Sequence, residues 1–428
     1  MDNLIKKIYS ETDNNKHNTM KNIRHKYKDN NFETETFSKY CSEYNYQPAI
    51  MNAVSRIVVL GDIHGDYELA INMLTIAKVI KIINDTILWS GNDTYVVQVG
   101  DQIDSCRPFD NLQCNNPETT INDKPDDIKI LKLFTNLHSQ AIKSGGAVIS
   151  LLGNHEILNA SGQMNYVSYK NLEDNNGLKG RIEMFKPGNE MGKFLGCTRN
   201  SAVIIGSNLF VHAGIIDGLI NEIGISTTNG KDDIALIDIA IRHWLLGLED
   251  RKIVRNIINS TDKSIFWTRK LGYIKPNEPA NNPTCMANLE LVLETFGINR
   301  IIIGHTPQSF TFSKKINGTC GNKLIRVDNG SSMAFHRFDN IYMSSNVVSE
   351  GRIPQVLEIL NDEIVNISFM HNNNIVTEPI NNINFDVDRS ITISSSDVDI
   401  EVEKIGFVGK KLLRSRIHKH NKNITINR

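Results

Sequence analysis

RIVVLGDIHGD, residues 56–66, begins as an apolar run of strand length and ends in glycine, aspartate and histidine. Four later segments repeat this order: TYVVQVGDQID (94–104), AVISLLGNHE (147–156), LFVHAG (209–214) and RIIIGHTPQ (300–308). Each run is apolar on both faces, which is typical of strands buried in a layered α/β sheet. The sequence therefore predicts an α/β fold in which polar residues gather where the strands end.

Between these runs, apolar residues recur every three or four positions, and this spacing predicts amphipathic helices. Three helices are expected, over residues 69–80, 131–141 and 289–296. The last two stop shortly before Gly145 and Gly297, and glycine is common just past the end of a helix. Helices are therefore expected to cover the sheet.

The remaining segments suggest how the chain is organised. A polar N-terminal extension includes an amphipathic stretch, 32–44, that is expected to pack on its neighbour. One large domain follows, with QVLEILNDEIVNISFM (355–370) predicted to form a hairpin that turns at Asn361 and Asp362. A C-terminal extension ends in a basic, mobile tail. The expected boundaries are 1–50, 51–370 with insertions near 106–127, 159–200 and 217–283, and 371–428.

Composition excludes several classes of protein. Hydrophobic residues make up 40% of the 428 residues, so the chain can bury a core. The 47 Lys and Arg residues balance 48 Asp and Glu residues, so no global nucleic-acid footprint is present. The sequence has neither a membrane-spanning apolar stretch nor a signal-peptide pattern, and a cytoplasmic protein is expected. Its six cysteines form no CxxC pair, and free thiols are expected.

The strand-end motifs supply carboxylates, imidazoles and an amide, a mixture that suits divalent transition metals. A single Gly-Asp pair is more often a turn or a helix cap, but five successive strand-end motifs are not explained in that way. Asp101 is the candidate carboxylate for sharing between two ions. The residues expected around it are Asp62 and His64 for the first ion, and Asn154, His212 and His305 for the second.

These motifs resemble the calcineurin-like metallophosphoesterases of the phosphoprotein phosphatase type, whose pattern is GDxHG, GDxxDRG, GNHE and two later histidine motifs. The resemblance covers about residues 56–335. GHTPQ (304–308), VDNGS (327–331) and FWTR (266–269) are most similar to the bacterial-type, Shewanella-like branch. The resemblance implies a four-layer αββα sandwich with two divalent ions, Mn, Fe or Zn, held by the six residues above.

The resemblance also implies a mechanism. A hydroxide that bridges the two ions would attack phosphorus in line, so no side-chain nucleophile is required. His155 would protonate the leaving oxygen, and Asp104 would orient it. Asn154, Arg107 and Arg269 would contact the substrate phosphate.

One departure from the family pattern concerns Arg107. The family has Arg-Gly directly after the second aspartate, whereas Asp104 is followed here by Ser105, Cys106 and then Arg107. Arg107 would reach the phosphate if the loop bulges; the alternative is a surface residue. Likewise, the alternative for Arg269 is a charge at a helix end with Trp267 in the core. Cys106 is adjacent to Arg107, a spacing that does not fit a cysteine nucleophile, and a free thiol is expected.

The first hypothesis is therefore a metal-dependent phosphatase that acts on phosphate monoesters, with phosphoserine or phosphothreonine in proteins as substrates and phosphotyrosine still open. The second is a hydrolase of small phosphoanhydrides or phosphodiesters, such as dinucleoside polyphosphates, because the same metal core serves these reactions. The third is a catalytically inactive binding protein of the same fold. The complete ligand set argues against the third hypothesis, and the altered loop at Ser105 is its only support.

Overall fold

Three predicted strands pair in parallel at the centre of a seven-stranded sheet. The computed structural model describes residues 19–29, 31–109, 111–311, 315–336 and 353–380. The three strands are β2 (Arg56–Leu60), β5 (Tyr95–Gln98) and β6 (Ala147–Leu151). Beyond β6 the sheet continues with β7 (Arg199–Asn200), and beyond β2 with β13 (Gln355–Leu360), β14 (Ile364–His371) and β15 (Asn374–Pro379).

A second sheet of six strands contains the other two predicted runs, β9 (Asn208–Val211) and β10 (Arg300–Ile303). In spatial order its strands are β1 (Ile50–Met51), β8 (Ala202–Ile205), β9, β10, β12 (Leu324–Arg326) and β11 (Asn317–Thr319). A separate hairpin consists of β3 (Ile80–Ile83) and β4 (Thr86–Trp89).

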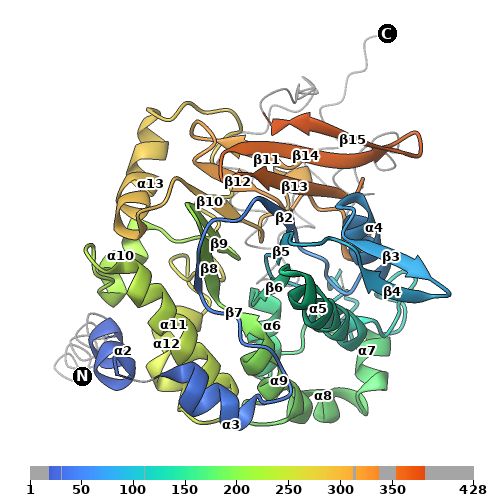
Figure 1. Cartoon of the computed structure of the whole chain (residues 1–428). Coiled ribbons are helices and arrows are strands. Elements are labelled where there is room, and N and C mark those ends of the chain that lie inside the picture. Colours follow the sequence, from blue (N-terminus) through green and yellow to red (C-terminus); the bar gives the residue numbers. More distant parts are fainter. Residues whose placement is uncertain (1–18, 30, 110, 312–314, 337–352, 381–428) are drawn as a thin grey trace, which may run out of the picture.

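The two sheets face each other across a shared apolar core. Ile57, Val97 and Ile149 come from the first sheet, and Phe210 and Ile302 from the second. The outer face of the first sheet is covered by α4 (Tyr67–Ile76) and α5 (Asp127–Ala141). The outer face of the second is covered by α10 (Asp217–Ile223), α11 (Gly230–Leu245) and α13 (Pro283–Phe296) (Figure 1). The predicted four-layer αββα sandwich is confirmed.

The helix ends follow capping rules. The Asp66 side chain accepts a hydrogen bond from the backbone N–H of Leu69 and so caps α4. This helix stops at Ile76, so the prediction that it reaches Ile80 was wrong, because Ile80 begins β3. The glycine predicted to end α13, Gly297, has the left-handed backbone of a helix C-cap, with φ of 55°.

The predicted hairpin between β13 and β14 is confirmed. Asn361 and Asp362 have φ values of 51° and 64°, and the N–H of Glu363 donates to the carbonyl of Leu360 at 3.1 Å, as in a type I′ turn. Leu360 pairs with Ile364, so the loop has three residues. The Asp362 carboxylate also accepts from the backbone N–H of Ser207, which ties this turn to the second sheet. The sheet continues through Pro379, beyond the predicted domain end near residue 370. The basic tail lies outside the described residues.

Further helices surround the strand ends. From the N-terminal segment, α2 (Thr19–Tyr27) packs Met20 and Ile23 into the core formed with α11, and 32–44 begins with a π-helix, Phe32–Phe37, and α3 (Ser38–Tyr40). Four helices follow β6: α6 (Asn154–Ala160), α7 (Tyr169–Asp174), α8 (Gly177–Phe185) and α9 (Glu190–Thr198). The short α12 (Arg255–Ile258) lies between α11 and α13. Across the described ranges, every helix is too short or too polar to span a bilayer.

All six cysteines are paired, so the expectation of free thiols was wrong. The disulfides are Cys41–Cys197, Cys106–Cys114 and Cys285–Cys320. Their Cα–Cα distances of 5.4, 5.8 and 5.5 Å are ordinary for disulfides. The partners of the first pair are 156 residues apart, and only the folded chain brings them together. The missing CxxC spacing therefore gave no evidence against long-range pairing.

Candidate active site

The loops that follow five strands meet at one edge of the sandwich, with Asp101 at their centre. Its Oδ2 atom lies 3.3 Å from Nε2 of His212 and 3.8 Å from Nε2 of His64. His64 Nε2 is also 3.9 Å from Oδ2 of Asp62. All four side chains are buried.

Two clusters of potential metal ligands share Asp101. In one, atoms of His64, Asp101 and His155 lie within 4.8 Å of one another; in the other, the atoms come from Asp101, His212 and His305. The amide of Asn154 joins the second cluster, since its Oδ1 is 2.9 Å from both His212 Nε2 and His305 Nδ1. The structure thus brings all six predicted ligands together and adds His155 at the edge.

The hydrogen bonds of the two later histidines fit a cation between them. His212 Nδ1 is 2.9 Å from the carbonyl of Val99, and His305 Nε2 is 3.1 Å from the carbonyl of Trp267. We assign the ring protons to these nitrogens, because only an N–H can donate to a carbonyl. If the rings are neutral, the opposite ring nitrogens face the Asn154 oxygen as acceptors. A convergence of acceptors is stabilised by a cation, and imidazole nitrogens with oxygen donors suit divalent transition metals.

Three of these residues have left-handed backbones. The φ values are 49° for His64, 53° for Asp101 and 65° for His305, a conformation that costs about 1 to 2 kcal/mol for residues other than glycine. Specific contacts hold it: the His64 N–H donates to the Asp101 carbonyl at 2.9 Å, and the His305 N–H donates to Asp62 Oδ2 at 3.0 Å. The surrounding structure thus imposes an unfavourable conformation that directs the side chains to one point.

His155 and Asp104 form a buried pair beside these ligands. Nδ1 of His155 is 2.8 Å from Oδ2 of Asp104, and its Nε2 is 3.9 Å from Oδ2 of Asp101. The His155 backbone N–H also donates to Asp101 Oδ1 at 3.0 Å. Asp104 therefore holds the Nδ1 proton, and the other ring nitrogen faces the ligand cluster.

Arg107 is buried, with 9% of its surface exposed, so the alternative of a solvent-facing residue is wrong. Its Nη1 donates to the carbonyls of Asp104 and Cys106, at 2.9 and 2.8 Å. The guanidinium carbon lies 4.8 Å from the ring centre of Phe335 and 5.7 Å from that of Tyr166. The pKa of His64 is lowered, first by burial and then by the charge of Arg107, so this charge acts on the ligand cluster.

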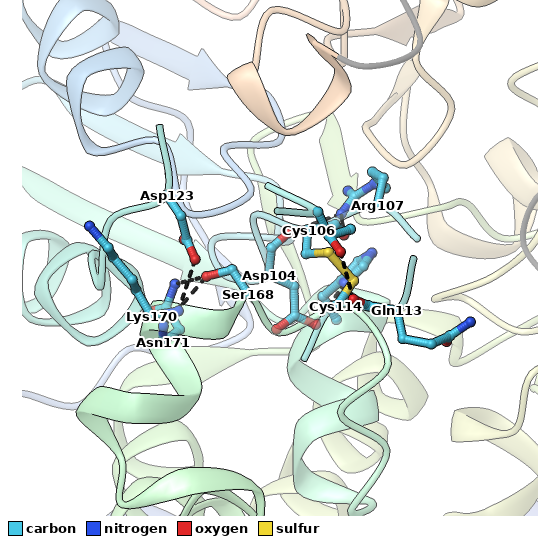
Figure 2. Close-up of a disulfide and its surroundings, with 11 residues drawn as sticks. Asp104, Cys106, Arg107, Gln113, Cys114, Asp123, Ser168, Lys170 and Asn171 are labelled. Carbon is cyan, nitrogen blue, oxygen red and sulfur yellow. Dashed lines mark hydrogen bonds and ion pairs between the residues drawn. A yellow bond between two sulfur atoms is a disulfide. The ribbon is translucent and has the colours of Figure 1, made fainter. Parts of the chain in front are cut away.

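The loop that carries Arg107 is fixed at two points. Cys106 is bonded to Cys114, and Figure 2 shows this disulfide with Arg107 on one side and Asp104 on the other. The Cys106 backbone N–H donates to the carbonyl of Tyr166 at 3.1 Å. The two extra residues before Arg107 are therefore part of an anchored bulge.

Arg269 contacts a second residue of the cluster, His305. It is half-buried, and its Nη1 donates to the carbonyl of His305 at 2.8 Å. Burial, followed by the positive charge of Arg269, lowers the pKa of His305 well below its usual value. Two arginine charges thus flank the predicted ligands.

The sequence profile of the calcineurin-like phosphoesterases matches residues 55–309, which include all five strand-end motifs. The chain belongs to this family. The phosphoesterase is similar to Shewanella-like protein phosphatase 2 of Arabidopsis thaliana, with 27% identity over 73% of this chain and 77% of that protein. It is also 25% identical to Shewanella-like protein phosphatase 1 of Plasmodium berghei, over 65% and 67% of the two chains.

Two further proteins are similar to this chain. Uncharacterized protein R398 of Acanthamoeba polyphaga mimivirus is 36% identical over 54% of this phosphoesterase and 95% of its own length. The solved cold-active protein-tyrosine phosphatase of a psychrophilic Shewanella species superposes with a TM-score of 0.56 over 78% and 83% of the chains. At 20% identity, this likeness shows a shared fold. The resemblance to the Shewanella-like branch is confirmed, and relatives named as phosphatases support a hydrolase.

Sequence reasoning assigned no role to Glu156, the last residue of GNHE. Its buried carboxylate accepts from the backbone N–H groups of Asp101, Gln102 and Gly153, at 3.0, 2.8 and 2.6 Å. Gly153 allows its own loop to pack against Asp101, since a Cβ at this position would lie 2.1 Å from Oδ1 of Asp101. Glu156 thus holds the loop of the central carboxylate, and its place in the motif was the available signal.

Asp328, in VDNGS, was also not predicted as part of the site. Its Oδ2 is buried and has no hydrogen-bond partner among the described residues. Burial raises the pKa of Asp328 to about 7. Burial also raises the pKa of Asp62, and the charges of Asp328 and Asp101 add to this effect. Three buried carboxylates so close together need compensating positive charge, which agrees with a site for cations.

Proposed function

We propose that this phosphoesterase hydrolyses phosphate monoesters, with phosphoserine and phosphothreonine in proteins as its substrates. One observation carries the proposal. Asp101 is shared by two clusters of ligands, and the His155–Asp104 pair lies at their edge, with His155 Nε2 3.9 Å from the shared carboxylate. This arrangement combines metal donors with a proton donor, as hydrolysis of an unactivated ester requires.

The metal donors divide into two sets. When bound, two divalent ions supply Lewis acidity, which lowers the pKa of water and neutralises the phosphoryl oxygens. Mn, Fe and Zn remain the predicted metals. In this proposal, Asp62, His64 and Asp101 would hold the first ion, and Asp101, Asn154, His212 and His305 would hold the second.

In this proposal, the chain's own residues bind the phosphate and move one proton. Arg107 and Arg269 attract the phosphate, and the Asn154 amide binds it from within the ligand cluster. His155 keeps one proton on Nδ1, against Asp104, and delivers the other from Nε2 to the leaving oxygen. Without that proton, an alkoxide leaving group departs slowly, so the pair matters most for serine and threonine esters.

Phosphotyrosine is the second candidate substrate. The rings of Tyr166 and Phe335 lie 5.7 and 4.8 Å from the Arg107 guanidinium carbon, so aromatic side chains lie beside the group that would bind phosphate. An aromatic substrate ring would pack against such a surface. Hydrolysis of small phosphoanhydrides or phosphodiesters and a non-catalytic binding role remain the alternatives.

A substrate panel tests the proposal. Purified protein is loaded with Mn²⁺ and assayed on matched phosphoserine, phosphothreonine and phosphotyrosine peptides, p-nitrophenyl phosphate and diadenosine tetraphosphate. We expect the highest kcat/KM on phosphoserine or phosphothreonine peptides. Preference for phosphotyrosine selects the second candidate, and preference for diadenosine tetraphosphate contradicts the monoesterase proposal. Absence of turnover on all five substrates, with metals bound, supports the binding protein.

The cytoplasmic location stays a prediction. The three disulfides count against it, because reducing pathways keep most cytosolic thiols unpaired. Alkylation of free thiols in freshly lysed cells, followed by mass spectrometry, tests the location. Modified Cys41 and Cys197 would favour a reducing compartment, whereas unmodified cysteines would favour an oxidising one.

A further inference from the structure

A fully buried polar network lies behind Asp104. Arg181, on α8, is its centre and has no exposed surface. Its Nε donates to Oδ1 of Asn159 at 2.9 Å, its Nη1 to Oδ1 of Asn175 at 3.0 Å, and its Nη2 to Oδ2 of Asp127 at 2.8 Å. A single guanidinium thus joins α6, the segment after α7, and the first turn of α5.

Two partners of Arg181 hold Asp104 directly. Asn159 Nδ2 is 3.0 Å from both carboxylate oxygens of Asp104. Asp127 Oδ1 accepts from the Asp104 backbone N–H at 3.1 Å. Asp104 has a left-handed backbone, with φ of 72°, so its conformation needs such support. Both its side chain and its backbone therefore depend on residues that Arg181 fixes.

The charges agree with this geometry. Asp104 and Asp127 are both fully buried, and two buried carboxylates destabilise one another unless a positive charge compensates them. Arg181 Nη2 is 2.8 Å from Asp127 and 3.7 Å from Oδ1 of Asp104. It is thus a counter-charge for both carboxylates. Burying a guanidinium costs free energy, so a fully buried arginine at this place indicates that its charge is needed by the two carboxylates.

A second buried pair shows that buried arginines here are not all connected to the site. Arg242 is 1% exposed, and its Nε donates to Asp238 at 2.7 Å. Asp238 in turn accepts from the backbone N–H of Ser201 at 2.6 Å. Neither residue of this pair contacts a predicted ligand, His155 or Asp104 in the described residues. Arg242 is therefore a matched control for the loss of a buried arginine.

We propose that Arg181 is a positioning residue for proton delivery. Through Asn159 and Asp127 it fixes Asp104, and Asp104 directs the ring of His155. Arg181 touches neither the substrate nor the ligand cluster, so its removal should affect only the step in which the leaving oxygen is protonated. This inference rests on the proposed role of His155 as the proton donor.

The test compares two leaving groups in Arg181→Met. We expect kcat on a phosphoserine peptide to fall about 10- to 100-fold, within the range for impaired acid catalysis, and kcat on p-nitrophenyl phosphate to change less than about threefold. KM should be unchanged for both. Arg242→Met should lower thermal stability without separating the two substrates. Arg181→Lys, which keeps the charge but not the three-way contact, should restore part of the lost rate.

A double variant links the effect to His155. If Arg181 acts through His155, then Arg181→Met should cost nothing further in a His155→Asn background, because effects of residues that act as one unit do not add. Should Arg181→Met fail to fold, Arg181→Lys and Asn159→Ser carry the same comparison, since Asn159→Ser breaks the bridge but keeps the charge.

The outcomes separate this inference from the proposed function. Equal losses on both substrates in every folded Arg181 and Asn159 variant overturn the positioning role, provided that His155→Asn still discriminates between the leaving groups. If His155→Asn itself does not discriminate, the proposed role of His155 has failed, and the inference fails with it.

Discussion

The ligand side and the proton-donor side of the site are built in different ways. On the ligand side, Asp62, Asp101 and His305 each lie two or three residues after the end of a strand, so the paired sheets fix their positions. On the other side, Asp104 and Arg107 lie on a loop supported by helices, by Asn159 and by the Cys106–Cys114 disulfide. The positions of the proposed ligands therefore follow from local sequence, whereas the proposed proton delivery and phosphate binding depend on distant segments.

The largest effect is expected on the ligand side, from Asp101→Asn. The amide has no negative charge to offer two cations, so turnover should fall to the detection limit while the fold is retained. Mass spectrometry measures the metal content, circular dichroism checks the fold, and an activity assay measures the turnover. Asp250→Asn, at an exposed residue that caps a short 3₁₀-helix (Arg251–Ile253), is the control. Unchanged metal occupancy with a near-normal rate would contradict the shared-carboxylate assignment.

The next effect tests the proton donor. His155→Asn should lower kcat on alkyl phosphates by about 10²- to 10⁴-fold, the usual contribution of general acid catalysis. The loss should be smaller on p-nitrophenyl phosphate, because p-nitrophenolate needs little protonation to leave. His138→Asn, which removes a buried imidazole on α5, should reduce stability without this substrate dependence. Equal losses on aryl and alkyl esters would assign His155 another role.

A smaller effect is expected for Arg107→Ala, which removes a proposed phosphate contact. A charge-assisted hydrogen bond contributes about 1.5 to 3 kcal/mol, so kcat/KM should fall roughly 10- to 150-fold. Arg107→Lys should recover only part of this, since lysine lacks the planar fork. Steady-state kinetics of these two variants and of Arg269→Ala show which arginine binds the phosphate. A silent Arg107→Ala, with a defect in Arg269→Ala alone, would place phosphate binding on one arginine.

The smallest effect concerns the disulfide beside Arg107. Replacing Cys106 and Cys114 by serine frees the loop, and ordering one residue again costs about 1 to 2 kcal/mol, so KM should rise about fivefold to 30-fold with little change in kcat. The matched control replaces Cys285 and Cys320, which close a 35-residue loop away from the ligands. That variant should lose up to about 4 kcal/mol of stability with KM unchanged. If the Cys106/Cys114 variant and the unmodified protein have equal KM values, the hydrogen bond to Tyr166 alone anchors the loop.

The strand-end pattern was enough to predict the sandwich and to select the residues that meet at its edge. This succeeded because parallel strands have their carboxyl ends at the same edge of a sheet, so the residues that directly follow such strands lie near one another. Capping signals were equally local. Asp66 begins α4, and Gly297 ends α13, as the residue types require.

Contacts between distant segments could not be predicted in this way. Arg181 was one basic residue among several in 159–200, and nothing in the local pattern distinguishes a buried arginine from a solvated one. Cys41 and Cys197 carry no signal of their pairing, because 156 residues separate them. Glu156 was visible inside a motif, but two of its three backbone partners, Asp101 and Gln102, lie on a loop that only the fold brings close.

The pattern of disulfides is nested, and this has a consequence for how the chain is made. The loop closed by Cys41 and Cys197 contains the Cys106–Cys114 bond. During synthesis Cys41, Cys106 and Cys114 emerge long before Cys197, and six cysteines allow 15 complete pairings. If neighbouring thiols were oxidised in order of emergence, Cys41 would be bonded to Cys106. The native pattern therefore requires either that Cys41 stays reduced until Cys197 has emerged or that an early wrong bond is exchanged. In the second case, the yield of correctly paired protein depends on thiol–disulfide exchange in the compartment where the chain matures.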